Sequence, residues 1–486
     1  MVSGIQGRIL NIVKSMYTGL LSSIRINEHL TDWFSIEKGV RQGDNLAPTL
    51  FAIFINDLVP EINCLNCGIS LDNDFSISTL FYADDIVLMS GSEEGLQRQL
   101  NVLNKWSTKW SLNVNIDKTK ILHVRRASFS RSNYHFKLGE LRLEYMKEYR
   151  YLGLTISDTL DYIVGVNQLL VASSRALGSL VSKYYRNDGM DYEVYTKLFN
   201  CTIAPIIDYA SGVWGFKPYD GIEKLKNRAI RSYLGVGKFT PIPALNGEMG
   251  WIPSSIRNHC QMIRLWCRIV DMDKRRIPYR TFLWDSRLSE NYSDTWKNNV
   301  KSIMDECGLM NLFSNKTTDG LSGKFISAIV KDKLMQKYSS KWFEDIETLP
   351  KLRTYKHLIT NYSVQSYVQS SITRQERSLL ARFRCGVFPL EIETGRYRGT
   401  PVERRFCKIC RSGMVEDEEH FILKCQAYSV KKDEMLNSFQ NLNNCDLTNI
   451  DDKEKLKILL NCDAKTIGKI IIDIFNIRLD RLSRRN

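Results

Sequence analysis

Two adjacent aspartates inside an apolar run constrain the fold of this chain more than any other feature. Leu80–Tyr82 precede Asp84 and Asp85, and Ile86–Met89 follow them. Burying an unpaired carboxylate costs several kcal/mol, so the pair needs either water or a cation beside it. The pattern predicts a β-hairpin whose tight turn presents both carboxylates. Two interpretations of that turn stay open: a divalent metal site, and an ordinary solvent-facing turn.

A glycine-containing turn lies upstream and leads into an amphipathic helix. Gly39 and Gly43 permit close approach of the backbone, and Arg41 and Gln42 between them offer a cation and a bidentate amide. We expect Asn45 to cap the helix that follows. Its apolar residues keep helical spacing: Leu46, Leu50, Phe51, Phe54, Ile55 and Leu58. A glycine-rich turn before a helix N-terminus is a common cradle for a phosphate or a nucleotide.

The remaining signals up to residue 160 alternate between helices and short strands. Helices are expected over Ile5–Tyr17 and Leu96–Trp110. Hairpins or strands are expected over Leu21–Ile36, Leu112–Ile116, Ile121–Val124, Phe136–Leu143 and Tyr151–Ile156. This order is not a repeating βαβ series, so it predicts an α+β domain built on a small antiparallel sheet.

Strand signals fade after Ile163, and helical spacing takes over. Helices are expected over Val171–Tyr185, Tyr192–Tyr209, Ile222–Leu234, Ile256–Asp271, Arg374–Arg384 and Ile467–Asn486. The third of these carries a basic row, which is either an ordinary solvated face or a face that follows phosphates: Lys224, Lys226, Arg228 and Arg231.

The charge of the chain favours a polyanionic partner. Lys and Arg number 68 against 54 Asp and Glu, a net charge of +14. Nucleic acid is the usual partner of so basic a protein, and simple solubility is the alternative. Twelve cysteines in 486 residues are too sparse for a disulfide framework. The chain opens without a secretory signal, and no apolar run reaches the roughly 18 residues of a membrane span. We therefore expect a reducing compartment, nuclear or cytoplasmic, and no membrane partner.

Residue types that bind metals cluster near the C-terminus. Cys407, Cys410, His420 and Cys425 follow one another at short spacing, with Gly413 in the loop between them. Four such ligands satisfy tetrahedral Zn²⁺, and a site closed by four protein ligands is structural rather than catalytic. The alternative is chance clustering in a chain that contains many cysteines.

Basic and aromatic residues surround this cluster. They would give it phosphate contacts and stacking surfaces: Arg396, Tyr397, Arg398, Arg404, Arg405, Phe406, Lys408, Arg411 and Tyr428. The acidic run Glu416–Glu419 indicates that one face of the cluster points away from nucleic acid.

Four motifs in one order give residues 1–160 a specific resemblance. They are Gly39–Pro48 (GVRQGDNLAP), Phe81–Asp85 (FYADD), Asn115–Lys120 (NIDKTK) and Tyr151–Gly153 (YLG). This order resembles the palm of a reverse transcriptase of the non-LTR retrotransposon type, where the motifs correspond to the family's B, C, D and E. The segment Cys407–Cys425 is similar to the zinc-knuckle-like module near the C-terminus of many such elements.

The resemblance implies a role for each motif. Asp84 and Asp85 would bind Mg²⁺ or Mn²⁺ for two-metal nucleotidyl transfer. Lys118 would donate a proton to pyrophosphate, with Lys120 as the alternative. The residues implied for contact with the nucleotide and the template are Arg41, Gln42, Gly43 and Tyr82. Those implied for the primer grip are Tyr151, Leu152 and Gly153. The implied partners are an RNA template, a DNA target or primer, and dNTPs.

The resemblance also implies one more aspartate, on a strand that precedes the helix at Ile5–Tyr17. Asp32, Asp44 and Asp57 do not match it. We therefore expect a chain that starts after this motif and that does not extend a primer by itself.

The fold class expected is α+β: a partial polymerase palm, then a mainly α-helical thumb and connection, then a small zinc-binding module. The expected parts are an incomplete palm (1–160), a thumb-like helical region (161–284), a connecting helical region (285–373), a basic zinc-knuckle-like module (374–430) and a C-terminal helical tail (431–486). The function implied is an RNA-directed DNA polymerase of a non-LTR retrotransposon. The alternatives are a catalytically dead nucleic-acid-binding remnant and an inert product. The sequence leaves the template, the target site and the oligomeric state open.

Overall fold

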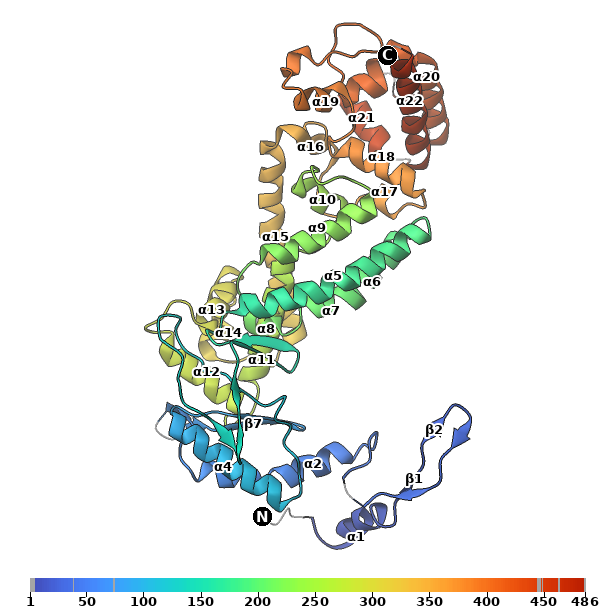
Figure 1. Cartoon of the computed structure of the whole chain (residues 1–486). Helices are drawn as coiled ribbons and strands as arrows, with labels where there is room; N and C mark the ends of the chain where they lie inside the picture. The colour runs from blue at the N-terminus through green and yellow to red at the C-terminus, as the bar shows by residue number, and fades with distance from the viewer. Residues whose placement is uncertain are drawn as a thin grey trace. The chain divides into compact units, whose positions relative to one another are not determined.

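The computed structural model describes residues 5–37, 39–72, 75–443, 447, 449–461 and 464–484. The chain forms two compact units, coloured by residue number in Figure 1. The first comprises Met1–Tyr149 and Ser157–Leu160, and the second comprises Arg150–Ile156 and Asp161–Asn486. The expected chain start at residues 1–4 and the expected helix end at residues 485–486 lie outside the described residues.

The first unit mixes short helices with two-stranded ladders. Its helices are α1 (Gly7–Met16), α2 (Ala47–Ile55), α3 (Leu58–Asn63) and α4 (Glu93–Lys109). Its strands are β1 (Leu21–Ser22), β2 (Arg25–Ile26), β3 (His29–Leu30), β4 (Phe34–Ser35), β5 (Ile69–Asp72), β6 (Phe75–Ile77), β7 (Thr79–Tyr82), β8 (Asp85–Leu88), β9 (Lys120–Ile121), β10 (Lys137–Leu138), β11 (Leu141–Arg142) and β12 (Glu144–Tyr145). The pairs β1–β4, β2–β3, β5–β6, β7–β8 and β10–β11 are antiparallel, whereas β9 runs parallel to β12. The expected hairpins are confirmed, but the strands form separate ladders rather than one sheet.

One apolar core holds the first unit together. The amphipathic face of α4 buries Leu100, Leu103 and Trp106 against residues of α2 and α3. The inward side chains of the β7–β8 hairpin, including Phe81 and Ile86, pack on the same core. Ser92 caps α4, because its Oγ accepts a hydrogen bond of 3.1 Å from the Gly95 N–H.

Two local expectations for the first unit are wrong. No strand forms over Leu112–Ile116; Val114 and Ile116 still pack on the core, but the Lys118 N–H donates to Asn115 Oδ1 and closes a turn there. Asn45 does not cap α2 either. Leu46 occupies the N-cap position, and no side chain caps the helix there. Asp44 instead closes the loop just before it, since its Oδ1 accepts from the Leu46 N–H at 2.9 Å.

The second unit is almost entirely helical. Its helices in chain order are α5 (Tyr162–Arg186), α6 (Tyr192–Leu198), η1 (Phe199–Ile203), α7 (Ala204–Ile207), α8 (Ser211–Trp214), α9 (Asp220–Leu234), α10 (Ile242–Met249), α11 (Ser254–Val270), α12 (Ile277–Leu288), α13 (Trp296–Glu306), α14 (Met310–Asn315), α15 (Gly323–Thr348), η2 (Pro350–Leu352), α16 (Tyr355–Leu358), α17 (Ser366–Gln369), α18 (Arg374–Arg384), α19 (Glu391–Tyr397), η3 (Val402–Arg404), η4 (His420–Lys424), η5 (Gln426–Tyr428), α20 (Ser429–Asn443), α21 (Asp452–Asn461) and α22 (Ala464–Ser483). The expected change from strands to helices after residue 163 is confirmed.

The hairpin of β13 (Glu148–Tyr151) and β14 (Leu154–Ser157) corrects another expectation. Tyr151–Ile156 is not one strand, because the chain turns between Tyr151 and Leu154. Leu152 and Gly153 have φ angles of +46° and +87°. A glycine tolerates this region of backbone space, which is why the turn forms there.

Buried tyrosines tie the helices of the second unit together. Tyr184, Tyr195 and Tyr233 are each 0% exposed. Their hydroxyls donate to backbone carbonyls of Tyr233, Ala229 and Val368, at 2.8, 2.9 and 3.1 Å. Burial raises the pKa of all three side chains, so they stay neutral donors.

Several basic residues of the second unit are buried rather than solvated. Lys226 on α9 is 2% exposed and pairs with Glu223 at 2.7 Å, so the basic row of this helix is not a continuous outer face. On α18, Arg377 is 3% exposed and Arg384 is 1% exposed. Arg384 Nε lies 3.0 Å from Oε1 of Glu248, whose side chain is also buried. Several cations of these two helices are therefore part of the core and are not exposed to a binding partner.

Two negative findings concern the described part of the chain. Its cysteines are all free thiols. None of its helices combines the length and the apolar character that crossing a bilayer requires.

Candidate catalytic hairpin and metal centre

The β7–β8 hairpin presents its two aspartates at a tight turn. Tyr82 pairs with Asp85 across the hairpin, which leaves Ala83 and Asp84 as the turn. Ala83 has a φ of +52°, the backbone conformation that such a turn demands. Tyr82, Asp84 and Asp85 are all exposed, while Phe81 and Ile86 fix the hairpin to the core. The predicted presentation of both carboxylates is confirmed.

The loop before α2 is fixed to the end of α1. Arg41 Nη2 donates to the Met16 carbonyl at 2.6 Å, and its guanidinium lies 5.8 Å from the ring centroid of Tyr17. A cation at a helix C-terminus is favourable. Gln42 and Gly43 follow in the exposed part of the loop. Gly43 has a φ of +88°, which a residue with a side chain would adopt only with strain.

Asp44 orders this loop, and the sequence alone did not single it out for that role. Its Oδ2 accepts from the Tyr17 hydroxyl at 3.0 Å, in addition to the bond from Leu46. The bond from the Leu46 N–H holds the pKa of the Asp44 carboxyl below its usual range. An aspartate two residues before a helical run was the available signal.

The two candidate proton donors differ in their surroundings. Lys118 lies exposed in the turn that Asn115 closes, and its carbonyl accepts from the Tyr149 hydroxyl at 3.0 Å. Lys120 instead pairs with Glu144 at 2.7 Å, and its side chain is 18% exposed. Lys118 is thus the more accessible ammonium of the two.

The three residues expected at the primer grip form the turn of the β13–β14 hairpin, within the second unit. The Leu152 carbonyl accepts a hydrogen bond from the Tyr209 hydroxyl. A Cβ on Gly153 would meet that tyrosine ring at 3.4 Å. That distance is an ordinary van der Waals contact, so the positive φ of Gly153, and not the space beside Tyr209, favours glycine here.

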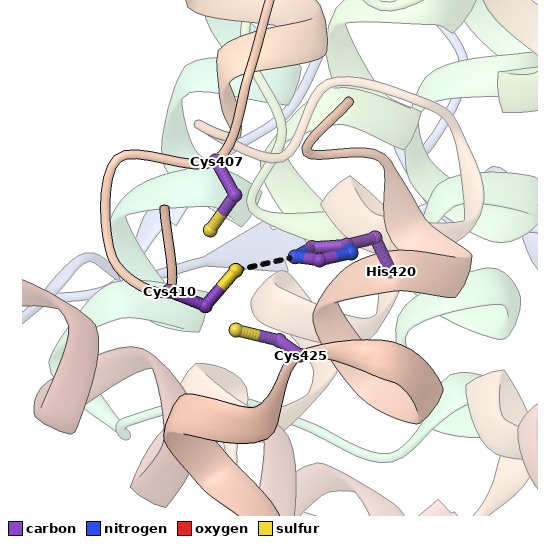
Figure 2. A group of neighbouring side chains, drawn as sticks. All are labelled: Cys407, Cys410, His420 and Cys425. Carbon is purple, nitrogen blue, oxygen red and sulfur yellow. Dashed lines mark hydrogen bonds between the residues drawn. The ribbon is translucent and has the colours of Figure 1, made fainter. Parts of the chain in front are cut away.

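Cys407, Cys410, His420 and Cys425 converge in the second unit, as Figure 2 shows. Their ligand atoms all lie within 4.8 Å of one another. Cys410 Sγ is 3.4 Å from His420 Nε2, close to the roughly 3.5 Å edge of a tetrahedral zinc site. Among the described residues this is the only group of three or more such side chains that could hold a metal ion.

The electrostatics of the cluster suit a cation. The hydrogen bond from Cys425 holds the pKa of the Cys407 thiol well below its usual range, against the opposing effect of burial. The same bond raises the pKa of Cys425. Burial lowers the pKa of His420, but its bonds with Cys407 and Cys410 outweigh that and raise it. A metal cation bound by all four side chains would replace the protons that the thiols and the imidazole now share.

Local backbone geometry brings the four ligands together. An antiparallel bridge joins Phe406 to Val415, and the Cys407 N–H donates to the Met414 carbonyl at 2.9 Å. Gly413, with a φ of +74°, lets the loop reverse. The single π-helical turn η4 places His420 and Cys425 on one side, where the Cys425 N–H donates to the His420 carbonyl at 2.8 Å.

The acidic run Glu416–Glu419 beside the cluster is not a uniformly solvated face, since two of its members are buried and two are partly exposed. That one face of the cluster points away from nucleic acid stays a prediction. Glu416 and Glu418 are each 1% exposed. Glu416 accepts two hydrogen bonds from Arg478 of α22, at 2.9 and 2.8 Å. Glu418 accepts two from Arg353, at 3.0 and 2.6 Å. Both carboxylates anchor the metal-ligand loop to distant parts of the second unit.

The basic and aromatic residues around the cluster differ in their exposure and in their partners. Tyr428 is 2% exposed, so the prediction that it stacks with bases is wrong. Arg405 donates to the carbonyls of Ile392 and Thr400, and Arg398 and Lys408 pair with Glu391. The exposed members are Arg396, Tyr397, Arg398, Arg404, Phe406, Lys408 and Arg411.

Comparison with known proteins finds relatives for part of the chain. Residues 4–156 match the family model for reverse transcriptase (RNA-dependent DNA polymerase). The RNA-directed DNA polymerase from mobile element jockey of Drosophila funebris is 25% identical over 225 residues, which cover 45% of this chain and 24% of that protein. The retrovirus-related Pol polyprotein from type-1 retrotransposable element R2 of Popillia japonica is 26% identical over 162 residues, which cover 32% and 27%.

These alignments span about a quarter of the length of those two relatives. The residues matched by the family model, 4–156, include the four motifs between residues 39 and 153. The N-terminal part of this chain is related to the reverse transcriptases of non-LTR retrotransposons.

Proposed function

We propose that the first unit is the catalytic part of an RNA-directed DNA polymerase. Asp84 and Asp85 bind the divalent ion of nucleotidyl transfer, and the loop Arg41–Gly43 with Tyr82 contacts the incoming nucleotide and template. The observation that carries this proposal is the β7–β8 hairpin: its apolar side is packed in the core while its turn holds two adjacent, exposed carboxylates. The match of residues 4–156 to the reverse transcriptase family model supports it.

The aspartate pair fits a hard divalent cation. Mg²⁺ prefers one or two carboxylates together with substrate phosphates over a cage made only of protein ligands. When bound, such ions lower the pKa of a primer hydroxyl and neutralise charge on the leaving pyrophosphate. The chain's own contribution is to hold two oxygen ligands on a rigid hairpin and to offer Lys118 as a proton donor. The Tyr151–Gly153 turn is proposed to grip the primer.

We propose further that the pair works with a third carboxylate, as the resemblance implies. Within the part of the chain that the structure describes, no third metal-ligating side chain groups with Asp84 and Asp85. Residues 1–486 are therefore expected not to extend a DNA primer on an RNA template with Mg²⁺ and dNTPs. Robust extension that Asp84→Asn abolishes would contradict this expectation.

The role of the aspartate pair can be tested without turnover. Asp84→Asn with Asp85→Asn is expected to weaken Mn²⁺ binding in the presence of template–primer and dNTP by at least about tenfold, because two charged ligands of a hard cation are lost. Titration calorimetry measures this. Asp32→Asn, an exposed aspartate elsewhere in the first unit, is the matched control. Equal Mn²⁺ affinity in the wild type and the double variant would sink the proposed metal site.

For the second unit we propose a structural Zn²⁺ held by Cys407, Cys410, His420 and Cys425. Three thiol ligands and one imidazole suit Zn²⁺, and no position is left for a substrate. The free cysteines agree with a reducing compartment, nuclear or cytoplasmic, which is part of this proposal.

The cluster with its exposed cations favours a second candidate function, nucleic-acid binding without catalysis. In that case salt-sensitive RNA or DNA binding survives Asp84→Asn and Asp85→Asn but weakens when Arg396, Arg404 and Arg411 are neutralised. Binding that is lost in the aspartate variants would exclude this candidate.

A further inference from the structure

Two exposed aromatic rings from distant parts of the second unit lie together. Phe239 is in the loop between α9 and α10, and Tyr397 ends α19. Their ring centroids are 6.2 Å apart. Phe239 is 62% exposed and Tyr397 is 64% exposed. Burial of such side chains would be strongly favourable, so two of them side by side at a surface indicate a binding site.

One buried ion pair positions both aromatic residues. Lys351 and Glu393 lie 2.6 Å apart, and their side chains are 10% and 6% exposed. Lys351 Nζ donates to the Phe239 carbonyl at 3.2 Å, and the Tyr397 hydroxyl donates to Glu393 Oε1 at 3.1 Å. These bonds fix the backbone at Phe239 and the side chain of Tyr397 before any ligand arrives, which lowers the entropic cost of binding.

Positive charge flanks the pair. Lys238 Nζ lies 5.0 Å from the ring centroid of Phe239. Arg396, next to Tyr397 in the chain, is exposed and acts electrostatically on the tyrosine hydroxyl. The carboxylate of Glu393, which accepts from the Tyr397 hydroxyl, is already paired with Lys351. Aromatic faces beside cations match the bases and phosphates of an unpaired strand, whereas an apolar partner would gain nothing from the cations.

We propose that Phe239 and Tyr397 form a stacking platform for bases of single-stranded nucleic acid, with Lys238 and Arg396 contacting the adjoining phosphates. The platform rests on the proposed function for its class of ligand. It lies outside residues 4–156, the part that matches the reverse transcriptase family. It thus gives the second unit a substrate contact of its own.

The test measures binding of a fluorescein-labelled single-stranded RNA of mixed sequence to residues 1–486, by anisotropy. Phe239→Ala and Tyr397→Ala are each expected to weaken binding about tenfold, the size typical for loss of one base–aromatic stack. Tyr397→Phe keeps the ring and loses only the hydroxyl, so it is expected to bind within about twofold of the wild type. Phe325→Ala removes another exposed aromatic residue, on α15, and serves as the control.

An abasic strand of equal length and charge separates stacking from attraction to phosphates. Wild-type protein is expected to bind it at least about tenfold more weakly than the normal strand, and the double variant Phe239→Ala with Tyr397→Ala to bind both strands alike. Unchanged RNA affinity in both alanine variants would overturn the proposal; a site for a protein partner predicts that result. Equal losses in Tyr397→Phe and Tyr397→Ala would also overturn it, since the ring would then be irrelevant.

The platform and the catalytic proposal can fail separately. If the Mn²⁺ affinity is unchanged when Asp84 and Asp85 are replaced, while Tyr397→Ala still weakens RNA binding, the catalytic proposal is wrong and the platform proposal is supported. The reverse pattern removes the platform alone.

Discussion

Cys407→Ser is expected to abolish zinc binding by the purified protein and to destabilise the second unit by more than about 4 kcal/mol, the range that follows loss of a structural metal. Cys407 and Cys425 are nearly or fully buried within the main apolar core of this unit. Removing the cation would leave polar side chains there that compete for protons. Elemental analysis is expected to give about one zinc per wild-type chain, and thermal unfolding to show the loss of stability.

Chelation extends the same experiment. A strong chelator is expected to lower the unfolding temperature of the wild type toward that of Cys407→Ser and to leave the variant unaffected. Cys201→Ser changes an exposed free thiol of the same unit and is expected to keep both zinc and stability. Zinc far below one equivalent in the wild type, or an unchanged content in Cys407→Ser, would refute the zinc site.

Arg384→Met is expected to cost about 3–5 kcal/mol of stability, because it leaves the buried Glu248 carboxylate without its counter-charge. Arg384 and Glu248 side chains are 1% and 0% exposed. The guanidinium also donates to the Leu460 carbonyl, Asn461 Oδ1 and Gln365 Oε1, at 3.0, 2.8 and 2.8 Å. One side chain thus satisfies acceptors on four residues from three separate segments. The shift of the urea unfolding midpoint measures the cost.

Arg374→Met is the matched control, since Arg374 begins the same helix α18. Its side chain is 38% exposed and pairs with Asp188, which is 83% exposed, at 3.3 Å. Surface pairs of this kind contribute about 0–1 kcal/mol. Adding Glu248→Leu to Arg384→Met is expected to recover part of the loss, because apolar side chains can replace a buried ion pair. A cost below about 1 kcal/mol for Arg384→Met would show that the pair contributes little.

Features that depend on residues close together in the chain could be predicted from the sequence. The Asp84–Asp85 hairpin follows from apolar residues on both sides of a polar turn, and the metal ligands follow from the short spacing between Cys407 and Cys425. The strand expected at Leu112–Ile116 failed although its alternation is real. Alternation shows which side chains turn inward, but a strand also needs a partner, and the Asn115 side chain closed a turn instead.

Features that depend on distant residues could not be predicted. Glu416 and Glu418 look like a solvated acidic run because their partners, Arg478 and Arg353, are far away in the sequence. Phe239 could not be assigned to a site from the sequence for the same reason, because only the folded chain brings it close to Tyr397. Whether a charged side chain is buried depends on such pairings between distant residues, and the amino-acid composition does not contain that information. The division into five parts stays a prediction.

The bond between Arg478 and Glu416 has a consequence for synthesis on the ribosome. All four metal ligands leave the exit tunnel before Arg478 does. Until α22 arrives, the Glu416 carboxylate lacks the guanidinium that pairs with it in the core, and burying a carboxylate without a counter-charge is unfavourable. The ligand loop can capture its metal early, but it reaches its final packing only when the last helix is complete. Chains that terminate shortly before residue 478 would therefore contain every metal ligand but lack the counter-charge that accompanies Glu416 into the core.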